Sequence, residues 1–156
     1  MPARDEPVGP ADYTRALEKT IRSAGLGEVV RMRPGLPQPE FHRLLAQHDA
    51  MFFPSIWDEP LSDTMIEAMA LGLLVIGTTT GGSGEILRDG QTGLTFPAED
   101  GPRLAEQILR SREQPELLES LADQGERFVR QQYTMEGMLD QIEKHLLGLL
   151  EAQRGE

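Results

Sequence analysis

The 156-residue chain has no cysteine and far fewer basic than acidic side chains. Without cysteine it cannot form a disulfide framework or a thiolate metal site. Its 15 Lys and Arg against 26 Asp and Glu give a formal net charge of −11. Nucleic acid and anionic membranes are bound through clustered basic side chains, so we expect neither of them as a partner.

Long apolar runs are also absent from the sequence. None reaches the roughly 18 residues that predict a membrane span. The first ten residues, MPARDEPVGP, lack the apolar segment of a signal peptide, and their proline content predicts a loose end over residues 1–10. We therefore expect a cytoplasmic protein, and the length favours a single domain over residues 11–156.

Short apolar runs alternate with helical patterns along the rest of the chain. The runs at 29–32, 50–53, 73–76 and 93–96 predict strands, and apolar spacing predicts helices near 13–24, 41–48, 63–71, 104–109, 117–129 and 135–150. This order predicts the α/β class: a single Rossmann-like domain, a parallel sheet with helices on both faces, and a helical C-terminus. We expect His48 to lie near the core and the last helix to pack on the sheet, although its apolar stripe also fits a partner helix.

Ligands of parallel sheets bind beyond the carboxyl ends of the strands, where two loops are predicted here. The first, residues 54–62, contains Glu59 and leads into the helix that carries Glu67. A carboxylate accepts hydrogen bonds from the vicinal hydroxyls of a sugar or ribose. Both acids can equally be solvated surface groups, but Ile66 and Ala68 place Glu67 among apolar positions, where an acid needs a partner. Trp57 fits either stacking on a ligand or covering the edge of the core.

The second loop, residues 77–84, is rich in threonine and glycine. Gly81, Gly82 and Gly84 permit close backbone approach to a ligand. The dinucleotide-binding glycine pattern is not met, because Leu87 stands where its last glycine belongs. Taken alone, this segment is equally compatible with an ordinary turn.

The two loops together carry a more specific pattern. The stretch PSIWDEPLSDTMIEAMALGLLVIGTTTGGSGEILRDGQTGLTFPAED holds a proline–serine turn, an E-x7-E pair ending in E-A-M-A-x-G, a strand, a T-x-x-G-G-x-x-E loop and a G-x-x-G. This order resembles the group 1 family of retaining GT-B glycosyltransferases, which use nucleotide-sugar donors. The resemblance implies the C-terminal, donor-binding half of a GT-B fold.

The resemblance also implies roles for individual residues. Glu59 would contact the donor sugar and is the candidate catalytic residue, and Glu67 would hydrogen-bond the ribose hydroxyls. The remaining implied donor-binding residues lie near the sugar (Pro60, Leu61, Ser62), the diphosphate (Gly81, Gly82, Ser83) and the base (Arg33, Pro34). No metal or other cofactor is expected, because positive groups and helix dipoles can stabilise the leaving diphosphate.

The sequence departs from the family pattern in three respects. Ser62 stands where the family usually has glycine, and Leu74 where it often has proline. The third departure is a missing part of the fold: the early strands that carry the diphosphate-binding cations have no counterpart, which leaves as substitutes only Arg15, Lys19, Arg31 and Arg33, and there is no room for the N-terminal domain that binds the acceptor.

We therefore expect the donor-binding half of a retaining glycosyltransferase that moves a hexose from a nucleoside diphosphate sugar and needs an N-terminal domain or a protein partner. Three alternatives stay open. They are a nucleotide-sugar-binding module without chemistry, an interaction module derived from the same fold, and a related sugar-nucleotide epimerase.

Overall fold

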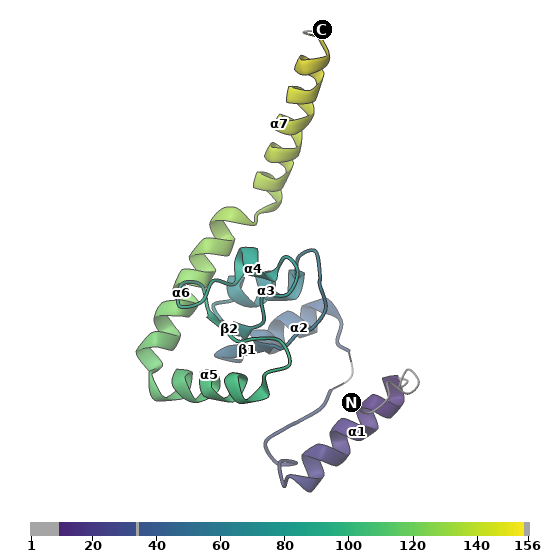
Figure 1. Ribbon diagram of the computed structural model, residues 1–156, viewed down its shortest axis with the longest axis vertical. Coiled ribbons are helices and arrows are strands. Elements are labelled where there is room, and N and C mark those ends of the chain that lie inside the picture. The colour runs from purple at the N-terminus through teal and green to yellow at the C-terminus, as the bar shows by residue number, and fades with distance from the viewer. Residues whose placement is uncertain (1–9, 34, 155–156) are drawn as a thin grey trace. The chain divides into compact units, whose positions relative to one another are not determined.

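A computed structural model describes residues 10–33 and 35–154 of the chain (Figure 1). Most of the predicted loose end, residues 1–9, lies outside the described residues, and Pro10 already begins a helix. The chain divides into two compact units, residues 1–37 and 38–156. Each unit is described by itself.

The first unit contains helix α1 (Pro10–Ser23), as predicted from its apolar spacing. Gly25, with a φ of 69°, takes the left-handed conformation just beyond the helix. The strand predicted at 29–32 is wrong. The backbone N–H groups of Val29 and Val30 donate instead to the carbonyl of Leu26, at 3.0 and 2.8 Å, which makes a turn. A β-favouring run without a neighbouring strand has nothing to pair with, so its preference for extended backbone is not decisive.

The second unit is built on a parallel sheet of strands β1 (Ala50–Phe53), β2 (Leu74–Gly77) and β3 (Leu94–Thr95). The strand order is β1-β2-β3, with Phe53 opposite Gly77 and Ile76 opposite Leu94. Every residue of the central strand β2 is buried. The strands predicted at 50–53, 73–76 and 93–96 are thus confirmed, with ends that shift by one residue.

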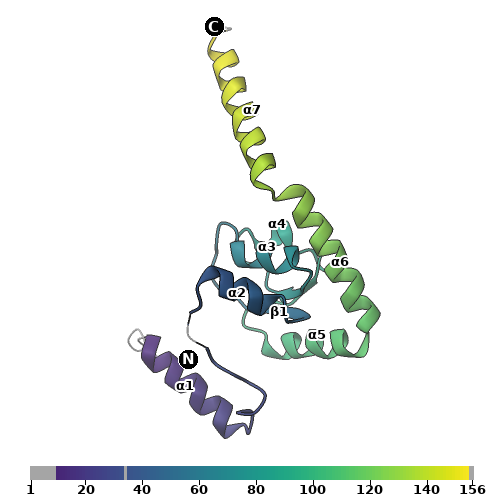
Figure 2. The ribbon, with the colours of Figure 1, turned by 180° about the vertical axis from the view of Figure 1, so that it is seen from behind.

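Helices cover both faces of this sheet, as predicted. Successive side chains of β2 point to opposite faces. Val75 belongs to one buried cluster, with Met65 and Met69 of α3 (Asp63–Ala70), while Leu74 and Ile76 belong to another with Leu121. Figures 1 and 2 both show α3 and α5 (Gly101–Glu113) on opposite sides of the strands. The remaining helices of this part are α2 (Gln38–Leu45), α4 (Ser83–Ile86), α6 (Pro115–Gln132) and α7 (Met135–Arg154).

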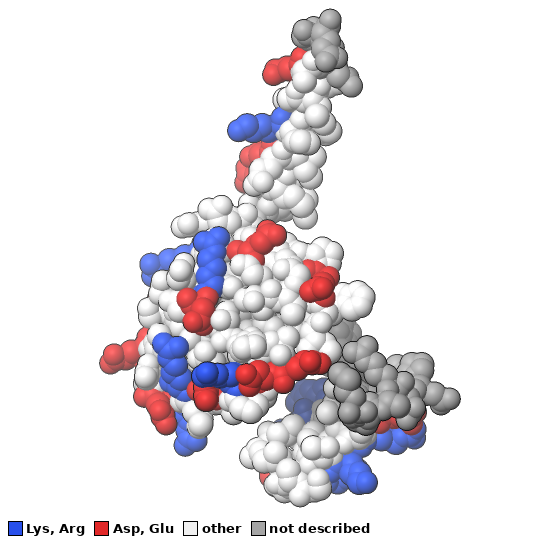
Figure 3. All heavy atoms as spheres, viewed as in Figure 1, with Lys and Arg blue, Asp and Glu red and all other residues white. Residues whose placement is uncertain are grey.

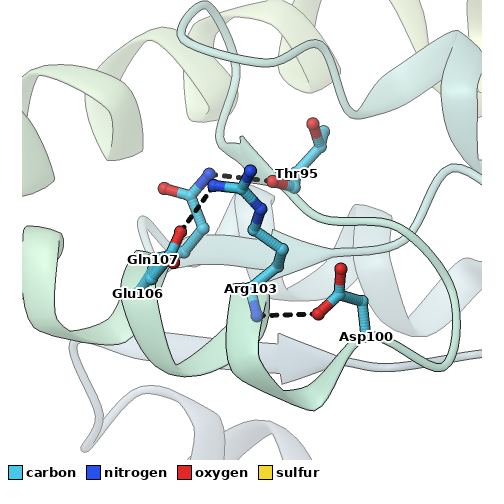
Figure 4. Close-up of polar contacts among 5 residues, drawn as sticks. All are labelled: Thr95, Asp100, Arg103, Glu106 and Gln107. Atoms are coloured by element: carbon cyan, nitrogen blue, oxygen red, sulfur yellow. Dashed lines mark hydrogen bonds and ion pairs between the residues drawn. The ribbon is translucent and has the colours of Figure 1, made fainter.

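Polar contacts cap helix α5 and join it to the end of β3 (Figure 4). Its N-cap Asp100 accepts a hydrogen bond from the backbone N–H of Arg103 at 3.0 Å. One turn later, the side chain of Gln107 donates to the carbonyl of Thr95 at 2.9 Å. On the exposed side, Arg103 pairs with Glu106 at 2.7 Å, and this contact raises the pKa of the arginine.

Two packing predictions are wrong. The apolar stripe of helix α7 (Met135–Arg154) does not pack on the sheet, because its large apolar side chains are exposed, from 70% for Met135 to 48% for Met138. His48 is also exposed. It lies beyond the end of α2, with its Nδ1 atom 2.7 Å from the carbonyl oxygen of Leu44. Apolar spacing identifies which face of a helix is hydrophobic, but it does not identify the surface that covers this face.

Candidate functional site

The two predicted ligand loops leave the same edge of the sheet. Because β1 and β2 are parallel, with Phe53 opposite Gly77, the segments that follow them begin side by side. The carbonyl of Phe53 accepts a hydrogen bond from the N–H of Thr78 at 3.1 Å, which extends the pairing one residue beyond the strands. This edge is where parallel sheets bind ligands.

Hydrogen bonds join the two loops into one structure. Thr78 and Thr80 donate from their hydroxyls to the carbonyl of Ser55, at 2.6 and 3.3 Å. Further along the same loop, the N–H of Gly81 donates to Asp58 Oδ1 at 3.2 Å. The N–H of Gly82 donates to the carbonyl of Glu59 at 2.8 Å. The position of Glu59 is therefore set by the second loop as well as by its own.

The paired glycines are required by this contact. A Cβ atom on Gly81 would lie 2.2 Å from the carbonyl oxygen of Glu59, and one on Gly82 would lie 1.7 Å from that of Pro60. Gly81 also has a positive φ of 55°. The expected close backbone approach is present, but the partner that the structure describes is the first loop. The prediction of a continuous loop to Gly84 is wrong, since Ser83 begins the short helix α4.

Glu59 is half-buried and is held within its own loop. The hydroxyl of Ser55 donates to its Oε1 at 3.3 Å. Trp57, two residues earlier, is 71% exposed, so it does not cover the edge of the core. Pro60 and Leu61 connect Glu59 to helix α3.

Helix α3 begins at the end of this loop. Ser62 is its N-cap: its buried hydroxyl accepts a hydrogen bond from the N–H of Met65 at 3.3 Å. The N-terminus of this eight-residue helix therefore directly follows Glu59, Pro60 and Leu61.

Glu67 has the partners that its apolar neighbours predict. Gln38 Nε2 donates to Glu67 Oε1 at 2.9 Å, and His42 Nε2 lies 3.0 Å from the same oxygen. The histidine contact depends on proximity and, when the ring is protonated, on charge. It is not a well-aligned hydrogen bond, since this nitrogen has no partner of good geometry. Within the described residues, neither contact uses Oε2.

Burial and polar contacts act in opposite directions on this carboxyl group. The side chain is only 26% exposed, and desolvation by itself opposes ionisation. The hydrogen bond from Gln38 and the contacts with His42 outweigh desolvation, so the pKa of Glu67 lies below its ordinary value. The carboxylate is therefore ionised and able to accept hydrogen bonds at neutral pH.

A groove of about 240 Å³ lies beside Glu67, lined by His42, Glu67, Ala70, Leu71 and Arg130. Arg130 comes from α6 and donates to the carbonyl of Ala70 at 2.7 Å. Its Nε also pairs with Glu126 at 2.7 Å. The positive charge at this end of the groove is therefore shared with an acid.

The other predicted site residues lie in different surroundings. The hydroxyl of Ser83 is buried and, within the described residues, has no hydrogen-bond partner. Arg33 is exposed in the first unit, and Pro34 lies outside the described residues, so the prediction that they read the base stays a prediction.

Basic groups near the two loops are scarce. Arg88 is the one basic residue between 54 and 100, and its guanidinium carbon lies 4.6 Å from the ring centroid of Phe128. In the first unit, Arg15 pairs with Asp12. On the face shown in Figure 3, basic and acidic side chains are intermixed.

Neither a metal-binding cluster nor a membrane-spanning helix is found in the described part of the chain. Among residues 10–33 and 35–154, no group of three or more His, Asp or Glu side chains is arranged to hold a metal ion. In the same part of the chain, no helix combines the length and apolar character needed to cross a membrane.

The sequence interpretation missed several residues that support this site. Gln38 and His42 were not singled out as partners of Glu67, although their spacing of four places them on one face of a helix. Ser55 and Thr78 belong to the family motifs, but the sequence assigns no contact to either residue. Their contacts cross between segments, and no local pattern indicates which carbonyl a hydroxyl will meet.

Comparison with known proteins identifies the family. A family model described as "Glycosyl transferases group 1" matches residues 8–128. The chain belongs to this family. The D-inositol 3-phosphate glycosyltransferase of Thermomonospora curvata is 30% identical over 118 residues, which are 73% of this chain and 27% of that protein.

Solved structures of glycosyltransferases share the fold. The crystal structure of Anabaena HepE in complex with UDP-glucose has a TM-score of 0.81 at 24% identity, over 90% of this chain and 38% of that chain. Sucrose-phosphate synthase from Thermosynechococcus elongatus has a TM-score of 0.80 at 25% identity, over 96% and 37%. The fold of this group 1 chain is therefore a Rossmann-like half of the GT-B architecture, and the chain spans well under half the length of these proteins.

Proposed function

We propose that this chain is the donor-binding part of a retaining glycosyltransferase that moves a hexose from a nucleoside diphosphate sugar to an acceptor hydroxyl. In that reaction the anomeric carbon forms a bond to the acceptor oxygen, on the same face of the sugar. The bond from this carbon to the diphosphate oxygen breaks, and the acceptor proton passes to the released diphosphate. Membership of the group 1 family supports glycosyl transfer.

The observation that carries the proposal is the joined pair of loops at the carboxyl edge of the sheet. Their hydrogen bonds hold the backbone of Glu59 in place. The helix that directly follows the first loop, α3, carries the ionised Glu67. A carboxylate in the first loop and another in the helix that follows it suit a ligand with two hydroxylated rings, namely the ribose and the hexose of a nucleotide sugar.

We assign the roles accordingly. Glu59 contacts the hexose and is the proposed catalytic residue, and Glu67 accepts hydrogen bonds from the ribose hydroxyls. The proposed donor-binding residues further include the helix entry Pro60, Leu61 and Ser62, the loop residues Gly81, Gly82 and Ser83, and the base-reading Arg33 and Pro34. No metal or other cofactor is part of the proposal.

The proposal requires positive charge from elsewhere in the enzyme. A diphosphate in a partly dry cleft needs cationic partners, because an unpaired buried charge costs several kcal/mol. Arg88, the one basic residue between 54 and 100, lies over the ring of Phe128. The segment between residues 54 and 100 therefore offers little positive charge to a diphosphate.

We further propose that an N-terminal GT-B domain, or a protein partner in its place, completes the enzyme. The matched proteins are more than twice as long as this chain. The exposed apolar face of α7 adjoins a groove of about 460 Å³, whose lining includes Leu61, Ile66, Tyr133, Met135 and Met138. An apolar surface of this kind is typical of a surface covered by another part of a protein.

A binding module without chemistry is the second candidate, because the two carboxylates can hold hydroxylated rings while few cations near the loops are available to stabilise a leaving diphosphate. Calorimetric titration of the 156-residue chain with UDP-, GDP- and ADP-glucose tests both candidates. We expect one donor to bind and Glu67→Ala and Glu59→Ala to weaken its binding, while Glu106→Ala on the exposed side of α5 serves as the matched control.

The outcomes of this titration separate the hypotheses. If the folded chain binds none of the donors, both candidates fail and the interaction module is favoured. If a donor binds, an assay for its hydrolysis, and for transfer once the remaining domain is supplied, distinguishes an enzyme from a binding module.

A further inference from the structure

We infer that Gln38 and His42 are positioning residues for Glu67: they engage one carboxylate oxygen and leave the other to accept the hydroxyls of the ligand. This inference rests on the proposed function, in which Glu67 binds a ribose. It assigns to helix α2 a role in donor binding that the sequence pattern did not indicate.

The geometry of α2 and α3 carries the inference. Gln38 and His42 are four residues apart, so they project from the same face of α2. Gln38 Nε2 lies 2.9 Å and His42 Nε2 lies 3.0 Å from the same atom, Oε1 of Glu67. One hydrogen bond from Gln38 and one close contact with His42 on the same oxygen restrict the direction in which the carboxylate plane faces.

The capacity of the carboxylate leads to the same conclusion. An ionised carboxylate has two oxygens with about four lone-pair sites. The contacts with Gln38 and His42 occupy Oε1, and within the described residues Oε2 has no protein partner. Two acceptor sites thus remain on Oε2, the number that two vicinal hydroxyls require.

The surroundings show why such positioning matters. The Glu67 side chain has three rotatable torsions, and a freely rotating carboxylate would have to be ordered when the ligand binds. Gln38 and His42 order it in advance. Arg130 of α6 lines the same groove as His42, and its charge is shared with Glu126. The ring centroids of Phe41 and His42 lie 6.2 Å apart.

The experiment is a double-mutant cycle on the 156-residue chain, with UDP, GDP and ADP as probes in calorimetry. Gln38→Leu and His42→Leu remove the two polar contacts, and His42→Gln keeps a polar N–H group at this position without a titrating ring. Each substitution is also made in a Glu67→Gln background. Gln47→Leu, a similar change at an exposed position just beyond α2, is the matched control, and thermal unfolding checks that every variant is folded.

We expect Gln38→Leu and His42→Leu each to weaken binding of the preferred probe about tenfold. His42→Gln should restore most of this loss, and Gln47→Leu should change nothing. In the Glu67→Gln background the same leucine substitutions should cause no further loss. The preference of the parent chain for UDP over its 2′-deoxy analogue, or the equivalent pair for another base, should shrink in both leucine variants.

Two results would overturn the inference alone. One is unchanged affinity in both leucine variants of a chain whose binding depends on Glu67. The other is an equal loss with and without Glu67, which would mean that α2 acts by another route. Failure of the parent chain to bind any probe is a different outcome, because it removes the proposed function and the inference together.

Discussion

Gly82 offers the sharpest test of how the two loops are joined. A Cβ atom on Gly82 would lie 1.7 Å from the carbonyl oxygen of Pro60, far inside van der Waals contact. The backbone of Gly82, with φ −72° and ψ −6°, is one that alanine adopts freely. The effect of Gly82→Ala is therefore purely steric: the two loops must separate, which also strains the bond from the Gly82 N–H to the Glu59 carbonyl.

The expected magnitude follows from the rigidity of the contact. The obstructing atom belongs to backbone, so no side chain can rotate away to make room. Overpacking of this kind costs about 1–3 kcal/mol and occasionally more, and we expect the upper end, about 3 kcal/mol. For a chain of this size that corresponds to a fall in melting temperature of about 6–12 °C. Binding of the nucleotide-sugar donor should fall as well, because Glu59 moves with its loop.

Gly84→Ala is the matched control, two residues along in α4. Its added Cβ would meet nothing closer than Thr79 at 3.6 Å, an ordinary contact. Replacing glycine by alanine in a helix gains about 0.5–1 kcal/mol, so this variant should melt at the same temperature or slightly higher. Thermal denaturation followed by circular dichroism measures both. If Gly82→Ala melts together with Gly84→Ala, the described contact between the loops is wrong.

Three further predictions concern stability. Ser83→Ala removes a buried hydroxyl that has no partner in the described structure, so chemical denaturation should show a stability that is unchanged or raised by about 1 kcal/mol. Ser62→Ala should instead lose about 1 kcal/mol of stability, because it removes the cap of α3. A loss of stability in both variants would contradict the unpaired state of Ser83. The pKa of Glu67 is lowered from 4.5 by folding, so its ionised form adds stability that is fully present above about pH 4.5 and is lost as the pH falls through the folded pKa. The difference in unfolding free energy between the parent chain and Glu67→Gln should shrink in that range, and a difference that grows in acid would show that the sign is wrong. Ile142→Ser on the exposed face of α7 should change the melting temperature of the isolated chain by no more than about 2 °C, because it removes little buried surface; a large fall would mean that this face is covered.

Local patterns predicted much of the fold because local physics decides it. The strands around 50–53 and 73–76 are short, apolar and closed by turn residues, and the two strands could be recognised without knowing their partners. Because parallel strands end at one edge, the meeting of the two loops that carry Glu59 and Gly81 also followed from the order of elements. The run at 29–32 has the same local preference, yet it forms a turn, since strand formation needs a neighbour that no residue in the run specifies.

The sequence by itself indicated the family, the class of fold and the candidate glutamate pair, because ordered motifs and apolar periodicity are properties of a linear chain. Tertiary structure alone decided what Glu67 touches, since Gln38 lies 29 residues away from it and reaches it only through the packing of α2 against α3. It also decided that the paired glycines make room for the backbone of Glu59 and Pro60, and that the apolar face of α7 stays exposed. A pattern records which side chains are available, and packing selects the partner that each of them meets.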